Sequence, residues 1–407
     1  MRDRAQRVLA ECAQIAGMSE EPGRITRRFL SPPVKTLHEH LRKRMEPLGM
    51  AVRIDAAGNL RGLWQPPNAR GKRLLIGSHI DTVPNAGKFD GVLGVVTAIE
   101  AVEIAKEFSL PLAIEVIAFS EEEGVRFGVP FIGSRAVAGR FDDSLLGHKD
   151  SEGITLDAAI RAFGLDPAQI GEATIDENVA AFFEIHIEQG PVLEAEGLQV
   201  AAVSAIVGQT RLSLEFLGQA NHAGTTPMHL RHDALAAAAE WIAVVESVAK
   251  NTEGLVATVG KVVVEPNAGN VIPGSVTVSL DVRHPQNPAR KASVEKLFDA
   301  AKTIAERRGL KLEQQSQLDQ TAVPMDERLT SFLADAIEAA GLPARQMPSG
   351  AGHDAMVMAA RVPAAMLFLR SPDGISHHPS EAVLEEDVEA ALHVVRNFLQ
   401  RFASQVR

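Results

Sequence analysis

Histidine and carboxylate side chains follow a short apolar run in the first quarter of the sequence. His79 and Asp81 come just after the run 74–76, and Asp90 follows a loop rich in glycine, proline and asparagine. Helical spacing begins after Asp90, so the three residues bracket a strand–loop–helix turn, where open α/β sheets place their sites. Such groups cost free energy to bury unless they bind a partner, and a metal ion is the simplest partner. The alternative is local: His79 ends a strand, Asp81 makes an Asx turn and Asp90 caps a helix.

Two further apolar runs end in the same kinds of side chain. The run 112–120 leads into three glutamates at 121–123, and the run 181–187 contains His186. Alone, an acidic triplet is usually a solvated charge run, and a histidine beside an apolar strand is usually a satisfied core residue. Because all three runs are typical of buried strands, their polar ends are expected to meet in one crevice of a sheet, which favours a shared site.

This combination of side chains suits divalent-metal chemistry. Imidazole and carboxylate groups bind Zn²⁺, Mn²⁺ and Co²⁺ alike. One carboxylate can bridge two ions, which then lower the pKa of a shared water and polarise a carbonyl group. A second carboxylate that is not a ligand can carry a proton from that water to a leaving nitrogen. The sequence has no P-loop, strand-linked G-x-G-x-x-G, HExxH or G-x-S-x-G motif, so nucleotide-binding, zincin and serine-hydrolase interpretations lack their anchor.

Composition narrows the class of protein further. The 407 residues are 45% hydrophobic and 23% charged, which is ordinary for a globular protein and long enough for two domains. The net charge of −11 and an aromatic content of 4% argue against a nucleic-acid partner. No apolar stretch is long enough to span a membrane. The single cysteine, Cys12, and an amphipathic N-terminus that does not resemble a signal peptide lead us to expect a cytoplasmic protein.

The pattern of predicted elements changes near residue 206. From there the order is β-α-β-β-α-β, typical of a ferredoxin-like split βαβ unit, with strands expected at 211–217, 255–264, 275–283 and 311–316 and helices at 232–250 and 289–308. Such a sheet can leave an edge strand free to pair with another copy. An α/β pattern resumes after residue 320, with a helix at 327–340 and a strand at 364–369. We therefore predict a discontinuous α/β catalytic domain, 1–205 and 318–407, interrupted by an inserted domain at 206–317.

Several sequence blocks, in order along the whole chain, resemble those of a known enzyme family. They are GSHIDT, FDG, SEEEGVRFG, EIHIEQGPVLE, NHAGTTPM, NVIPG, SGAGHDA and GISHHPSE. The resemblance is to the metal-dependent amidohydrolases of the hydantoinase/carbamoylase family, which cleave N-carbamoyl and ureido groups and are related to the di-zinc aminopeptidases. EIHIEQGP and NHAGTTPM are the most specific blocks. The resemblance implies a di-metal aminopeptidase-like catalytic domain and an inserted domain that acts as a lid and pairs two copies into a homodimer.

The resemblance also implies a role for each polar residue at the strand ends. It implies five metal ligands: His79 and His186 for one ion, Glu123 and His377 for the other, and Asp90 as the bridge. Glu122 would be the general base, and Asp81 would hydrogen-bond His79 and fix its tautomer. Two alternatives stay open. Glu121 precedes the expected pair of glutamates, so the assignment could shift by one position, and His378 could replace His377.

Five further residues match family positions that bind substrate, polarise the scissile carbonyl or stabilise the intermediate: Gln189, His222, Asn270, Arg283 and His353. The planar guanidinium of Arg283 suits a carboxylate, although a surface arginine at a strand end is the alternative. Asn270 could equally be a turn residue, and Asp354 could simply orient His353.

These residues lead to a prediction of function. We expect an amidohydrolase that uses two divalent metal ions per subunit, Zn or Mn with Co also suited, to cleave a linear ureido or carbamoyl acid. Allantoate is preferred over N-carbamoyl-L-amino acids and N-carbamoyl-β-alanine, because the HAGTTPM and SGAGHDA blocks are closest to that branch. The alternatives are an aminopeptidase or dipeptidase, against which the Gln189 block argues, and a non-catalytic binding protein, against which the complete set of expected positions argues.

Overall fold

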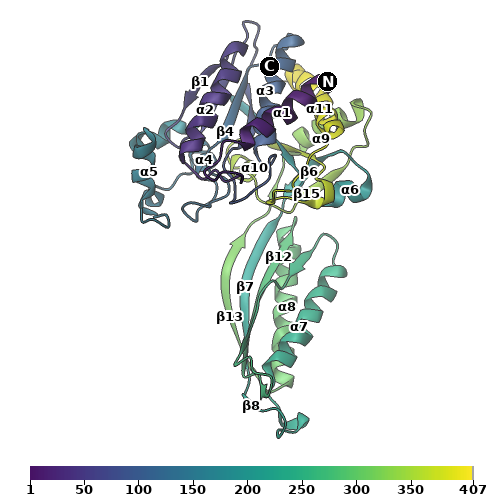
Figure 1. The fold of residues 1–407 in the computed structure, drawn as a ribbon. Coiled ribbons are helices and arrows are strands. Elements are labelled where there is room, and N and C mark those ends of the chain that lie inside the picture. The colour runs from purple at the N-terminus through teal and green to yellow at the C-terminus, as the bar shows by residue number, and fades with distance from the viewer. Residues whose placement is uncertain (406–407) are drawn as a thin grey trace. The chain divides into compact units, whose positions relative to one another are not determined.

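The computed structural model describes residues 1–405, and the chain divides into two compact units. Unit 1 comprises Met1–Ser204 and the chain from Met325 onward, and unit 2 comprises Ala205–Pro324. Among the described residues, no helix combines the length and the apolar character needed to cross a membrane. Each unit has its own sheet, helices and hydrophobic core (Figure 1).

Unit 1 is built on a mixed sheet of nine strands, which confirms the predicted α/β class. The strands are β1 (Ala51–Ile54), β2 (Leu60–Trp64), β3 (Arg73–His79), β4 (Ile114–Phe119), β5 (Val179–Ile187), β6 (Val200–Ile206), β14 (Val323–Pro324), β15 (Gln346–Ser349) and β16 (Ala364–Leu369). Their order is β1-β2-β4-β3-β5-β16-β6-β14, and β15 pairs with β6. Strands β1 and β2 form an antiparallel hairpin.

The four central strands, β4, β3, β5 and β16, run parallel to one another. In the pairing register, His79 at the end of β3 lies opposite Phe119 at the end of β4, and His186 near the end of β5 lies opposite Phe368 of β16. Because parallel strands end at the same edge of a sheet, the residues that follow these four strands are brought together there.

Helices enclose this sheet. The long ones are α1 (Arg2–Ala16), α2 (Pro32–Met45), α3 (Val92–Glu107), α9 (Glu327–Ala339) and α11 (Glu385–Gln405). The short ones are α4 (Ile132–Val137), α5 (Leu156–Phe163), α6 (Val192–Glu196) and α10 (Asp354–Met358), and the 3-10 turns are η1 (Glu46–Leu48), η2 (Asp143–Gly147), η3 (Pro167–Ala173) and η5 (Pro372–Gly374).

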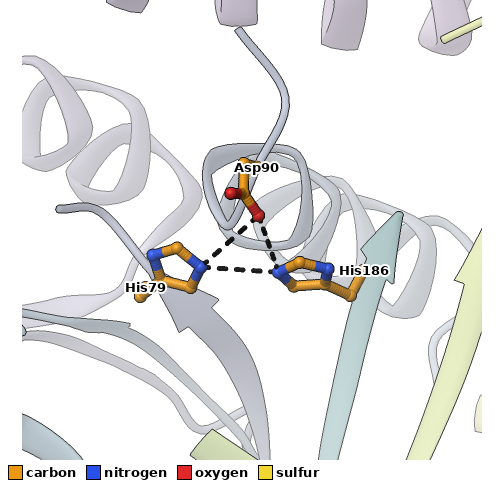
Figure 2. A group of neighbouring side chains, drawn as sticks. All are labelled: His79, Asp90 and His186. Atoms are coloured by element: carbon orange, nitrogen blue, oxygen red, sulfur yellow. Dashed lines mark hydrogen bonds and ion pairs between the residues drawn. The ribbon is translucent and has the colours of Figure 1, made fainter. Parts of the chain in front are cut away.

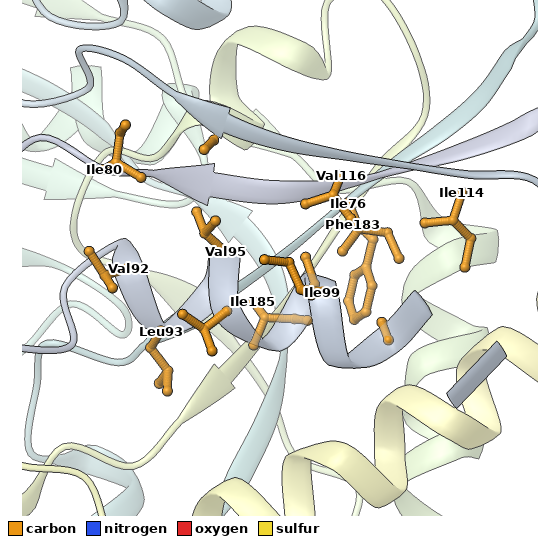
Figure 3. Close-up of a cluster of buried hydrophobic side chains, with 14 of the residues drawn as sticks. Ile76, Ile80, Val92, Leu93, Val95, Ile99, Ile114, Val116, Phe183 and Ile185 are labelled. Atoms are coloured by element: carbon orange, nitrogen blue, oxygen red, sulfur yellow. The ribbon is translucent and has the colours of Figure 1, made fainter. Parts of the chain in front are cut away.

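Helix α3 packs against β3, β4 and β5 (Figure 3). Its side chains Val92, Val95 and Ile99 lie with Ile76 of β3 and Ile185 of β5 in the buried cluster. Nearly the whole helix is buried, because α1 and α11 cover its other sides. A helix that is apolar all round is expected to be buried in this way. The core thus fixes the loop before α3, which contains Asp90.

Unit 2 has an antiparallel sheet with two helices. Its strands are β7 (Gly208–Leu217), β9 (Val256–Thr258), β10 (Val262–Glu265), β12 (Ser275–His284) and β13 (Lys311–Gln320), and its helices are α7 (Ala234–Lys250) and α8 (Asn287–Arg307). The order is β10-β12-β7-β13, with β9 beside β12. A separate ribbon pairs β8 (Asn221–His222) with β11 (Val271–Ile272), and η4 (Met228–Leu230) precedes α7. Alternate residues of β7 and β12 are buried against the helices, as in a sheet covered on one face.

Two sequence expectations differ from the structure. The expected strand 255–264 is two strands, β9 and β10, which pair with different parts of β12. Strand β6 was not predicted, and it carries the chain from unit 1 into unit 2. Its partner β14 brings the chain back, with Ile206 opposite Val323 and Ala205 opposite Pro324.

Candidate metal centre

The carboxyl ends of the central strands supply the polar side chains singled out in the sequence. His79 ends β3, the glutamates 121–123 follow β4, His186 lies in β5, and His377 follows β16. Asp90 comes from the loop before α3. Gly91 completes that turn with φ of +66°, and a Cβ there would come within 2.6 Å of the His79 ring. Only glycine therefore fits beside Asp90 at this point.

Three of these residues form a compact group of ligand atoms: His79, Asp90 and His186 (Figure 2). The Nε2 atoms of the two histidines are 3.4 Å apart, and Asp90 Oδ1 lies 3.8 Å from His79 Nε2 and 3.3 Å from His186 Nε2. Two nitrogen ligands about 2.1 Å from a zinc ion at a tetrahedral angle would be about 3.4 Å apart. The group therefore has the spacing that a bound divalent ion requires.

Main-chain contacts orient both imidazole rings toward Asp90. His79 Nδ1 donates to the main-chain oxygen of Asp81 at 3.1 Å, and His186 Nδ1 donates to the main-chain oxygen of Ile187 at 2.9 Å. When both rings are neutral, these bonds leave both Nε2 atoms as lone-pair donors facing the same point. Fixing the tautomer through the second nitrogen is how proteins prepare histidine for a metal ion.

A second group shares Asp90 with the first: Asp90, Glu123 and His377. His377 Nε2 lies 3.1 Å from Asp90 Oδ2 and 3.4 Å from Glu123 Oε1. The two oxygens of Asp90 are thus divided, Oδ1 toward the first group and Oδ2 toward the second. His378, the alternative to His377, is exposed and accepts a hydrogen bond from the main chain of Ser380.

The carboxylates of this centre are crowded and buried. Burial raises the pKa of Glu123 to about 7, and the nearby charge of Asp90 adds to this rise. Burial also raises the pKa of Asp90, but the hydrogen bond from His377 and the charge of His186 outweigh it and hold that pKa below its usual range. A divalent cation would offset this crowding of negative charge.

The histidines respond to the same field. Burial lowers the pKa of His186 to about 4, although Asp90 opposes the shift. For His79, burial is outweighed by the hydrogen bond and charge of Asp81, so its pKa lies well above its usual value. The hydrogen bond to Asp90 raises the pKa of His377 to about 8. At each of the three histidines a carboxylate therefore favours positive charge, although burial outweighs it at His186.

Glu122 belongs to neither group of ligand atoms, but the charges of His79 from the first group and Glu123 from the second act on it. It is buried, and burial raises its pKa well above the usual value, with His79 opposing and Glu123 adding to the rise. Glu121 is not part of a solvated run: it is fully buried, and its Oε2 has no hydrogen-bond partner within the described residues. The geometry therefore groups Glu123, and not Glu121, with Asp90.

The carboxylate of Asp81 lies close to both glutamates and to His79. Its Oδ1 accepts the N–H of Glu122 at 2.9 Å, and its Oδ2 accepts the N–H of Glu123 at 3.1 Å. The same Oδ1 lies 3.4 Å from His79 Nδ1, farther than the main-chain oxygen of Asp81. Asp81 therefore positions the two glutamates as well as the histidine.

Gln189 also points into the centre. Its side-chain nitrogen donates to Asp90 Oδ1 at 3.1 Å and to the hydroxyl oxygen of Ser376 at 3.2 Å. Gln189 and His377 both have positive φ, +58° and +56°. Non-glycine residues persist in this conformation where their surroundings hold them, often at functional sites.

His353 is buried next to the centre, with its ring centroid 4.4 Å from that of His186. Its Nε2 pairs with the hydroxyl of Ser349 at 2.9 Å, a partner that sequence reasoning missed. Asp354 was the expected alternative for orienting this ring, but within the described chain its carboxylate has no hydrogen bond to His353. In this structure His353 supports the ring of His186.

The other three predicted substrate residues belong to unit 2. His222 lies in β8, and Asn270 adjoins it, because the main-chain oxygen of Asn270 accepts the N–H of Ala223 at 2.9 Å. Arg283 lies near the end of β12, where Asp281 accepts hydrogen bonds from its Nε at 3.0 Å and its Nη2 at 3.1 Å. The structure brings His222 and Asn270 together and places Arg283 apart from them.

With this geometry established, comparison with known proteins identifies the family. The model of peptidase family M20/M25/M40 matches residues 75–401, and the chain belongs to this family.

Among its relatives, allantoate deiminase from Arabidopsis thaliana is 38% identical and covers 98% of this chain and 82% of its own length. N-carbamoyl-L-amino acid amidohydrolase from Geobacillus stearothermophilus is 36% identical, with 98% of each chain covered. The crystal structure of a hydantoinase/carbamoylase family amidase from Burkholderia multivorans matches with a TM-score of 0.92 at 31% identity, covering 99% of this chain and 98% of that one. The family resemblance seen in the sequence is confirmed.

Proposed function

We propose that this protein is a binuclear metal-dependent amidohydrolase that cleaves a carbon–nitrogen bond of a linear ureido or carbamoyl acid, with allantoate as the preferred substrate. One observation carries the proposal: the two oxygens of Asp90 face two separate groups of ligand atoms. A shared carboxylate of this kind is what a pair of divalent ions requires. His79 and His186 would complete one site, and Glu123 and His377 the other.

Two bound ions, Zn²⁺, Mn²⁺ or Co²⁺, would polarise the scissile carbonyl and lower the pKa of the attacking water. Glu122 accepts the proton of that water on a carboxylate oxygen and delivers it to the leaving nitrogen. Its burial and raised pKa suit a group that must both hold and release a proton. Asp81 keeps Glu122 in place through the main-chain hydrogen bond. The side-chain nitrogen of Gln189, held near Asp90, is the candidate donor to the substrate carbonyl.

The carboxylate of the substrate needs a cation away from the acidic centre. Arg283 is the candidate, because its guanidinium can bind a carboxylate through two parallel hydrogen bonds. Asp281 is paired with both Arg283 and Arg211, so two guanidinium groups lie beside one carboxylate here. We assign to unit 2 the role of a ferredoxin-like lid that brings Arg283 to the bound substrate and excludes water.

The placement of residues within unit 2 supports a site built from two copies of the chain. Strand β12 runs from Ser275 to His284, and Arg283 pairs with Gln209 at the beginning of β7. The other end of β7 leads to β8 and His222 (Figure 1). The eight residue-to-residue steps from Ser275 to Arg283 span about 26 Å at about 3.3 Å per step. One copy of unit 2 therefore cannot offer both Arg283 and His222 to a small ureido acid.

A homodimer that pairs through unit 2 would supply the two residues from different subunits. The edge strand β10 carries Val262 and Val263, which are 45% and 39% exposed, and Val256 of β9 on the same side is 60% exposed. An open strand edge with exposed valines favours pairing with another chain. We therefore propose that His222 and Asn270 act across the dimer interface.

Substrate tests should separate the proposed activity from its alternatives. The protein loaded with Mn²⁺ or Zn²⁺ should release ammonia from allantoate, and a chelator should abolish turnover. Faster hydrolysis of N-carbamoyl-L-amino acids or N-carbamoyl-β-alanine than of allantoate would reassign the substrate. Carbamoyl-amino-acid hydrolysis is the second candidate function, because the relatives include an N-carbamoyl-L-amino acid amidohydrolase as well as an allantoate deiminase. Cleavage of an unmodified dipeptide would favour an aminopeptidase. Bound metal without turnover of any of these compounds would indicate a binding protein.

Mixed dimers should show which subunit supplies His222. Glu122→Gln and His222→Ala subunits, each inactive alone, should regain activity when mixed. In a two-fold dimer with shared sites, each mixed dimer contains one site with both wild-type residues. Activity is measured after sedimentation has verified the dimers and tagged purification has isolated the mixed species. No recovery in verified mixed dimers would place His222 in the site of its own subunit, and a monomer at assay concentration would remove the dimer altogether.

A further inference from the structure

We infer that Glu381 is a positioning residue for the metal centre: it holds Asp90 in the orientation that divides its two oxygens between the two ligand groups. The inference rests on the proposed function, because it assigns a task in assembling that same centre. Glu381 follows His377 by four residues in the chain and is only 4% exposed.

The carboxylate of Glu381 joins the two loops that supply the shared ligands. Its Oε1 accepts the main-chain N–H groups of Phe89 at 2.8 Å and of Asp90 at 3.1 Å. Its Oε2 accepts the hydroxyl of Ser376 at 3.0 Å, and Ser376 directly precedes His377. One side chain thus fixes the backbone of the bridging residue and the start of the loop that carries His377.

The loop before Asp90 is shaped around this carboxylate. A Cβ at Gly87 would lie 2.2 Å from both the carboxyl carbon and Oε1 of Glu381, a distance too short for any side chain at this position. Alanine at position 87 would therefore push the carboxylate away from the N–H groups of Phe89 and Asp90. Gly87 gives a second, independent way of disturbing the same contacts.

These contacts show that the role of Glu381 differs from that of the metal ligands and from that of the proposed base, Glu122. Both of its oxygens are engaged by donors of the protein itself, and it belongs to neither group of ligand atoms. Its contact with Asp90 is through the main chain, whereas the Asp90 carboxylate faces the ligands. Loss of Glu381 should therefore weaken metal binding, and high metal concentration should restore turnover.

The test is a calorimetric titration of metal-free protein with Mn²⁺. Glu381→Ala should weaken binding by about 10–100-fold, as expected for a residue that orients a ligand without touching the metal. Glu381→Gln should keep most of the affinity, because the amide oxygen can accept both N–H groups and the amide nitrogen can donate to Ser376. At saturating Mn²⁺ the kcat of Glu381→Ala should approach that of the wild type.

Two control variants separate positioning from general damage. Lys88→Ala changes an exposed neighbour of Gly87 in the same loop and should bind Mn²⁺ like the wild type, whereas Gly87→Ala should bind as weakly as Glu381→Ala. Glu115→Gln removes another buried carboxylate, paired with Arg61 and Arg73 at the opposite end of β4. It should lower the melting temperature without changing the affinity for Mn²⁺.

The outcomes that would overturn the inference are distinct from failure of the proposed function. Wild-type affinity for Mn²⁺ in Glu381→Ala would exclude the positioning role. An equal loss of affinity in Glu381→Gln and Glu381→Ala would also exclude it, because the charge of Glu381 alone would then explain the effect. If Glu381→Ala fails to fold, Gly87→Ala becomes the test variant. Wild-type affinity for Mn²⁺ in Gly87→Ala would then overturn the inference. Absence of Mn²⁺ binding or turnover in the wild type itself would instead refute the proposed function.

Discussion

Replacing Glu122 with glutamine should lower kcat by about 10²–10⁴-fold while the protein keeps its divalent ions, because a residue that transfers a proton contributes about this much. Glutamine preserves the size of the side chain but cannot accept and release the proton. Glu122 lies outside both groups of ligand atoms, so the metal sites should survive the change. Steady-state kinetics and metal analysis of the purified variant give the two quantities.

Glu121→Gln is the matched control for this experiment. Glu121 is adjacent in sequence and fully buried, and burial together with the charge of Asp81 raises its pKa well above the usual value. It belongs to neither group of ligand atoms, and its Oε2 has no hydrogen-bond partner within the described residues, so a neutral amide of the same size should change kcat little. Should Glu121→Gln lose activity without losing metal while Glu122→Gln stays active, the base would be Glu121.

Asp90→Ala should have a different and larger effect on the metal centre. A bridging carboxylate offsets the charge of both ions, so its removal should empty at least one site and abolish most turnover. Bound ligand stabilises a folded protein in proportion to the logarithm of its concentration over Kd. Added Mn²⁺ should therefore raise the melting temperature of the wild type and raise that of Asp90→Ala much less.

Asp326→Ala provides the control for stability. Asp326 caps α9 by accepting the N–H of Leu329 at 2.9 Å, and loss of such a cap costs about 1 kcal/mol. This variant should melt at a lower temperature yet keep the full shift on addition of Mn²⁺. If Asp90→Ala binds two ions with wild-type affinity, the bridging role of Asp90 would be excluded, and Asp90 would act only at the N-terminal end of α3.

The core of the candidate site could be predicted from the sequence because it depends on strand ends. His79, Glu123 and His186 each adjoin an apolar run, and the physics of parallel sheets brings such ends to one edge. The family resemblance then favoured His377 over His378 and Glu123 as the ligand, but it left both alternatives open. The structure groups His377 and Glu123 with Asp90.

Contacts made through the main chain could not be predicted in the same way. The Glu381 carboxylate binds N–H groups almost three hundred positions earlier in the chain, and such contacts leave no pattern in side-chain type. The pairing of His353 with Ser349 instead of Asp354 depends on rotamers that spacing does not determine. The separation of Arg283 from His222 required the register of β12 with β7, which the order of strands does not specify.

The paired strands β6 and β14 have a consequence for how such a protein can change over evolutionary time. They place both ends of the segment Ala205–Pro324 side by side at one point of the sheet. Since closing a loop costs only about 0.6 kcal/mol more for each doubling of its length, a segment attached in this way can lengthen, shorten or be exchanged at little cost to the sheet that carries it. The strand ends that bear His79 and His186 would stay in register throughout. Selection could therefore alter the inserted segment and the metal-bearing sheet as separate modules of one gene.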